Sequence, residues 1–213
     1  MTIYIRPIAN ILRSTPGIVI LLFIWNAVTQ LFINIDSPLH HYWSGHIDSA
    51  WFFTAGRAWM NGLTPYVDFA DSKGPLLWLI YGIGYLISLH DFSGLYFISC
   101  VYYTAALWMC YRTALIFLQG QKIWSFLAAA AMVIPYFCWI DVEVRAESWC
   151  QLQLSYCLYR LTLAITSPSS RHDRKAMAWM GMAIASVMLI KWNLAILYGI
   201  IPCVIMATTA ATA

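Results

Sequence analysis

Long, uninterrupted apolar runs are the feature of this sequence that most restricts how the chain folds. A helix needs about 20 apolar residues to cross the roughly 30 Å of hydrocarbon in a bilayer. The runs do not alternate in polarity as the strands of a transmembrane barrel do. The sequence therefore predicts an all-α, polytopic helical membrane protein, with six candidate transmembrane helices at 17–34, 94–118, 124–140, 148–166, 176–192 and 194–210.

Composition supports the same class of protein. Hydrophobic residues make up 62% of the chain and charged residues 10%, whereas soluble proteins average roughly 45–50% and about 25%. These values exclude a soluble globular domain, a disordered chain and a disulfide-rich secreted module. The net charge is +3, and the basic residues do not form a continuous stripe, which argues against nucleic acid as a partner. The six cysteines are scattered through apolar runs, as expected of small buried hydrophobic residues.

The apolar segment 75–90 decides the topology, because as a helix it reaches only about 24 Å. It either spans the membrane or lies along its surface. Loops rich in Lys and Arg stay in the cytoplasm, and the N-terminus, 119–123 and 167–175 are such segments. All three fall on the cytoplasmic side only if 75–90 does not span, so we expect 35–93 to be one external segment.

This external segment is expected to hold two juxtamembrane helices, at about 48–61 and 75–90. The run 17–34 lacks a small-residue cleavage site at a suitable distance and is expected to be a retained anchor. With this topology eight of the nine acids face outside, together with four cations, Arg57, Lys73, Arg145 and Lys191. These cations at one membrane face are candidates for binding an anion.

Asp48 stands at the start of an expected amphipathic helix, where Trp51, Phe52, Ala55 and Trp59 recur at helical spacing and can sit in the membrane interface. Asp48 is either an N-cap or a general base, and the two roles are compatible because a capping carboxylate keeps a free oxygen. The preceding His40, His41 and His46 match no strong metal-ligand spacing.

Three further groups of polar residues follow along the chain. Asp68, Asp71 and Lys73 lie in a loop between two expected helices, where a solvated turn is the alternative to a site. Asp141, Glu143, Arg145 and Glu147 form a charged external loop, with interface anchoring as the alternative. Lys191 ends an expected span, either as a phosphate contact or as a lysine snorkelling beside Trp192.

The order of these features resembles the N-terminal part of the GT-C superfamily of membrane glycosyltransferases, in the branch of the protein O-mannosyltransferases and aminoarabinose transferases. After the anchor and Asp48, residues 62–77 read G-x-x-P-Y-x-D-x-x-D-x-K-x-P-L-L, which is the most specific part. The acidic loop and a span ending in Lys191 follow. The likeness covers residues 1–213 as the front half of such an enzyme, so we expect the C-terminal remainder of the transmembrane domain to be missing.

The resemblance implies an inverting transfer of a sugar from a polyprenyl-phosphate donor to an acceptor glycan, lipid or protein. Asp48 would be the base, with Asp141 or Glu147 assisting. The donor phosphate would contact Lys73, Lys191, Arg57 and Arg145, and Asp68, Asp71 and Glu143 would face the acceptor or shape the loop. No cofactor is implied, and a divalent metal is left open.

The resemblance also implies a place in the bacterial inner (plasma) membrane with a periplasmic site, and the basic residues Arg6 and Arg13 predict a cytoplasmic N-terminus. Two other classes of protein are alternatives. A transporter component is disfavoured because the middles of the expected spans carry almost no charge. A non-catalytic membrane scaffold or degraded fragment is favoured only by the abrupt end of the sequence within a span.

Overall fold

The computed structural model describes residues 14–34, 36–40, 47–133, 145–167 and 173–210. These residues form eight α-helices and one short 3-10 helix and, within the described part, no strand. In chain order the elements are α2 (Thr15–Ile33), α3 (Ile47–Met60), α4 (Pro75–Ile87), α5 (Ser93–Phe117), α6 (Lys122–Ala131), η1 (Ser148–Cys150), α8 (Gln151–Thr166), α9 (Arg174–Met188) and α10 (Trp192–Ala210). The expectation of an all-helical fold is confirmed.

Local sequence signals explain where several helices begin. Ser14 caps α2 by accepting a hydrogen bond from Gly17 N at 3.2 Å. Asp173 caps α9 in the same way, accepting from Ala176 N at 3.1 Å. Pro75 opens α4, where the missing N–H of proline costs nothing. The Ser14 and Asp173 side chains accept from backbone N–H groups that a helix start leaves without partners.

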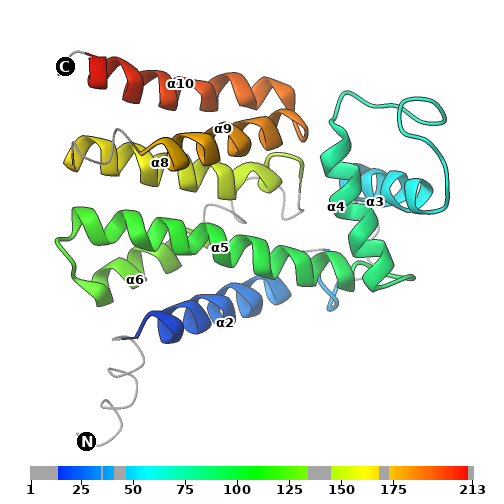
Figure 1. Cartoon of the computed structure of the whole chain (residues 1–213). Coiled ribbons are helices and arrows are strands. Elements are labelled where there is room, and N and C mark those ends of the chain that lie inside the picture. The colour runs from blue at the N-terminus through cyan, green and yellow to red at the C-terminus, as the bar shows by residue number, and fades with distance from the viewer. Residues whose placement is uncertain (1–13, 35, 41–46, 134–144, 168–172, 211–213) are drawn as a thin grey trace, which may run out of the picture.

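Figure 1 shows α2, α5, α6, α8, α9 and α10 lying side by side as a bundle, with α3 and α4 at one end of it. The start of α5, the 145–150 segment and the α9–α10 turn lie at that same end, which we call the site end. The α5–α6 turn and the start of α9 lie at the opposite end. Helix α4 runs across the direction of the bundle helices. The expectation that 75–90 lies along the outer membrane surface stays a prediction.

Two helices in the described residues, α2 and α5, are long and apolar enough to cross a membrane. By contrast, α4, α6 and residues 192–207 of α10 are shorter apolar helices. The length and composition of α2 and α5 give weak support for membrane association, and the other four expected spans and their orientation stay predictions. The expected span 124–140 is described only to residue 133.

A hydrophobic core at the site end joins elements that are far apart in the sequence. It contains Phe52 and Ala55 of α3, Trp78 and Tyr81 of α4, Trp149, and residues from the end of α9 and the start of α10. Phe52 and Ala55 were expected to face the membrane interface, but they pack on α4 instead. Helix α3 can cross α4 closely because Gly56 has no side chain; a Cβ there would lie 2.5 Å from Gly82 N.

Helix α2 is fixed to α5 by buried amide side chains. Asn26 Nδ2 donates to Cys100 O at 2.9 Å and to Thr104 Oγ1 at 3.2 Å. Gln30 Nε2 donates to Asn26 Oδ1 at 3.0 Å, and Gln30 Oε1 accepts from Ser99 Oγ at 2.7 Å. In an apolar surrounding these hydrogen bonds determine which faces of the two helices meet. They set the start of α5, and with it the framework of the site end.

Candidate functional site

The loop before α4 docks on the turn between α9 and α10 through its backbone. Gly74 N donates to Ile190 O at 2.9 Å, and Leu76 N donates to Leu189 O at 3.0 Å. The two chains approach so closely that a Cβ on residue 74 would lie 2.0 Å from Leu189 O. Because Gly74 directly follows Lys73 and Ile190 directly precedes Lys191, this contact brings the backbones of the two lysines close together.

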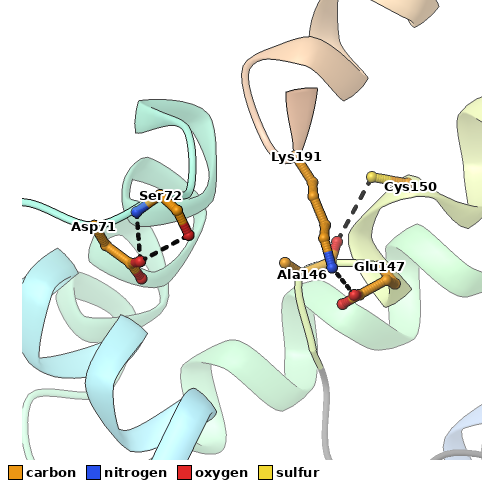
Figure 2. Close-up of polar contacts among 6 residues, drawn as sticks. All are labelled: Asp71, Ser72, Ala146, Glu147, Cys150 and Lys191. Carbon is orange, nitrogen blue, oxygen red and sulfur yellow. Dashed lines mark hydrogen bonds and ion pairs between the residues drawn. The ribbon is translucent and has the colours of Figure 1, made fainter. Parts of the chain in front are cut away.

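Lys191 forms an ion pair with Glu147, and Figure 2 shows its side chain reaching from the α9–α10 turn to the carboxylate. Glu147 directly precedes η1, whose residues Trp149 and Cys150 belong to the buried core. The lysine side chain is 21% exposed and the glutamate side chain 39%. The pair therefore lies at the boundary between the core of the site end and solvent.

Other charged residues surround Lys191. The pKa of Lys191 is lowered, and burial is the largest cause. The charges of Lys73 and Arg145 lower this pKa further, whereas the charge of Asp48 raises it. Each of these charges therefore lies within electrostatic range of Lys191. Glu147 is thus ion-paired with Lys191, and Asp48, Lys73 and Arg145 lie within its electrostatic range. The five residues come from four separate stretches of the chain. We call these five residues the charged cluster.

Asp48 lies in the first turn of α3 and is exposed to solvent. Its neighbour Ser49 is buried and donates through Oγ to Asp36 Oδ1 at 3.1 Å. Asp36 is itself only 7% exposed. This buried hydrogen bond fixes the start of α3 and so sets the position of Asp48. Sequence reasoning counted Asp36 only as one of several external acids, and no local pattern singles it out.

Asp68 and Asp71 shape the loop that carries Lys73. Asp68 Oδ2 accepts from Thr64 N at 2.6 Å and closes a turn. Asp71 accepts from Trp51 Nε1 of α3 at 3.2 Å and from Ser72, the contact drawn in Figure 2. Both carboxylates are therefore occupied within the protein, which favours the loop-shaping role over a contact with an acceptor.

Tyr66 holds the far side of the same loop. Its backbone adopts φ 65°, a conformation that non-glycine residues rarely take. Its hydroxyl donates to Lys73 O at 2.9 Å, and its ring lies 4.8 Å from the ring of Trp78. The tyrosine thereby attaches the backbone of Lys73 to the aromatic core of α4.

The remaining candidate residues lie elsewhere or outside the described residues. Arg57, near the end of α3, lies over the ring of Tyr85 at 5.6 Å, a cation–π contact on α4. Asp141 and Glu143 fall outside the described residues, as do His41 and His46. The Nδ1 atom of His40 lies 3.0 Å from Ser37 Oγ. Within the described ranges, no three His, Cys, Asp or Glu side chains gather as a metal-binding group.

A cavity of about 550 Å³ lies among α5, α8 and α9. Gln153 and Ser186 in its lining are hydrogen-bonded at 3.1 Å, and they are close in the sequence to Glu147 and Lys191. The rest of its lining is mostly apolar, with Met109, Leu152, Tyr156, Trp179, Met182 and Ala183. The cavity can accept an apolar chain.

Comparison of the chain with protein families, curated proteins and solved structures finds no match.

Proposed function

We propose that the protein is a membrane glycosyltransferase of the GT-C type, or the front half of one, which uses a polyprenyl-phosphate sugar as donor. The observation that carries the proposal is the convergence of Lys73, Arg145 and Lys191 with two carboxylates at one end of the bundle. Three cations and two carboxylates give the cluster a net positive charge, which suits an anionic donor.

The chemistry of the donor matches this charge balance. A polyprenyl-phosphate sugar is a phosphodiester with one negative charge, and loss of the sugar leaves a phosphate monoester with about −1.5 to −2 charge at neutral pH. Negative charge thus grows on the phosphate as the bond from the anomeric carbon to oxygen breaks. Preorganised cations such as Lys73 and Lys191 stabilise that growing charge more than they stabilise the bound donor.

Asp48 is the proposed general base. The acceptor hydroxyl attacks the anomeric carbon, its proton passes to the Asp48 carboxylate, and the phosphate leaves with the bonding electrons. A single displacement of this kind inverts the anomeric configuration. Asp48 is suited to the role because its carboxylate is exposed, lies within the electrostatic influence of Lys191 and is positioned by the Ser49–Asp36 hydrogen bond.

The apolar cavity among α5, α8 and α9 supports a lipid-linked donor. Gln153 of this cavity follows Glu147 by six positions and Ser186 precedes Lys191 by five. We propose that the prenyl chain of a donor whose phosphate lies at the cluster enters here. We place the site on the external face of the membrane, because the opposite end of the bundle carries the basic segments around Lys122 and Arg174. In a bacterium this face is the periplasmic side of the inner membrane.

The test is turnover of short-chain prenyl-phosphate sugars by purified protein with a membrane extract as acceptor source, read as release of prenyl phosphate. Asp48→Asn should abolish release while the variant keeps the unfolding midpoint of the parent chain. Asp91→Asn is the matched control: it removes the same charge from the loop before α5, where Asp91 contacts Ser88 and Ser93. Unchanged turnover in Asp48→Asn would exclude Asp48 as the base.

A further inference from the structure

The ion pair between Glu147 and Lys191 has a consequence for ligand binding. Lys191 is the cation around which Asp48, Lys73 and Arg145 gather, and its ammonium group is already held by a carboxylate. Carboxylate and phosphate oxygens are the same kind of acceptor for a lysine. Glu147 therefore occupies a position on Lys191 that a phosphate would take.

Glu147 and a phosphate cannot share Lys191 without a cost, because like charges at one cation repel each other. The exposed fractions of the pair indicate which partner moves. The Glu147 side chain is 39% exposed and can turn into water, whereas Lys191 is 21% exposed and held in a turn that is hydrogen-bonded to the Gly74 loop. An incoming phosphate would displace Glu147 and leave the lysine in place.

We propose that Glu147 is an internal counter-ion that blocks the phosphate position of the empty site and is displaced when a prenyl phosphate group binds. The identity of this ligand rests on the proposed function, but the displacement requires only an anion. Displacement releases the Glu147 carboxylate beside the bound phosphate. An additional carboxylate thus becomes available to the acceptor only after the donor has bound.

The proposal is tested by calorimetric titration of the purified full chain in detergent with geranyl phosphate, in parallel with inorganic phosphate. Removing the competitor in Glu147→Gln should tighten geranyl phosphate binding about five-fold, which corresponds to about 1 kcal/mol. Lys191→Gln should weaken binding, and the double variant should bind as Lys191→Gln does, because Glu147 acts through Lys191. Asp91→Asn should bind like the parent chain, which excludes an effect of net charge alone.

Unchanged or weaker binding by Glu147→Gln would overturn the proposal, as would tightening that persists in the double variant. If the variants do not fold, hydrogen exchange of the parent chain decides. Exchange at 145–150 should rise when geranyl phosphate displaces Glu147, and a fall or no change would refute the displacement. Equal tightening for inorganic phosphate would identify free phosphate as the ligand and leave the displacement supported.

These outcomes are separable from those of the proposed function. Tightening without turnover of any prenyl-phosphate sugar would support the counter-ion and contradict the transferase. Turnover without tightening would support the transferase and contradict the counter-ion.

Discussion

Gly74 offers a sharp test of how the charged cluster is assembled. Its backbone has φ −84° and ψ 162°, which any residue can adopt, so the need for glycine comes only from the missing side chain. A Cβ would lie 2.0 Å from the oxygen and 2.3 Å from the carbonyl carbon of Leu189. Both are backbone atoms, so Gly74→Ala should force the loop away from the α9–α10 turn.

The expected cost follows from the contacts that this movement breaks. The hydrogen bonds from Gly74 N to Ile190 O and from Leu76 N to Leu189 O are both lost. At about 1 kcal/mol each, with some loss of packing at the core of the site end, the free energy of unfolding should fall by about 2–3 kcal/mol. Binding of geranyl phosphate should also weaken, because Lys73 moves away from Lys191.

The assay is unfolding in mixed micelles by added SDS, followed by tryptophan fluorescence. Gly181→Ala is the matched control, since a Cβ at Gly181 of α9 meets nothing within 4 Å. This control should be neutral or stabilise the chain by up to about 1 kcal/mol, because alanine favours the helix. If Gly74→Ala proves as stable as Gly181→Ala and binds geranyl phosphate normally, the close docking of the loop is refuted.

Two further predictions concern charge and orientation. Lys73 lowers the pKa of Lys191, so Lys73→Gln should raise the pH above which geranyl phosphate binding is lost. Asp48 raises the pKa of Lys191, so Asp48→Asn should lower the pH at which binding is lost. Titrations across alkaline pH measure both shifts, and shifts in the same direction would contradict the cluster. In a chain whose own cysteines are replaced by alanine, Val67→Cys should react in whole cells with an impermeant thiol reagent, whereas Gln121→Cys should not. The reverse pattern would invert the proposed orientation.

The positions of most helices could be predicted from the sequence because long apolar runs between polar breaks define them. The expected 94–118 corresponds to α5 at Ser93–Phe117, and the expected 75–90 corresponds to α4 at Pro75–Ile87. The expected 176–192 ends early, at Met188, because residues 189–191 form the turn that receives the Gly74 loop. This end could not be foreseen, since the partner of the turn lies far away in the sequence.

The site was predictable in part for a related reason. The distribution of charged residues between the two sides of the membrane could indicate that five residues share one end of the bundle: Asp48, Lys73, Arg145, Glu147 and Lys191. It carries no information about which of them pair. The roles of Asp68 and Asp71 in the loop are local and follow from the turn-forming tendency of aspartate. The Ser49–Asp36 contact and the pairing of Glu147 with Lys191 depend on tertiary packing, for which the sequence holds no short-range signal.

The backbone contact between Gly74 and Ile190 also bears on the order of events during biosynthesis. The two residues are 116 positions apart, and at about 5–20 residues per second a ribosome needs roughly 6 to 23 s to make that stretch. Throughout this interval the loop that contains Gly74 is present in the nascent protein, but the turn at 189–191, which later accepts its N–H groups, has not been made. The charged cluster is therefore completed late in synthesis, and a chain halted shortly before Ile190 would expose the undocked loop to the quality-control proteases of the cell.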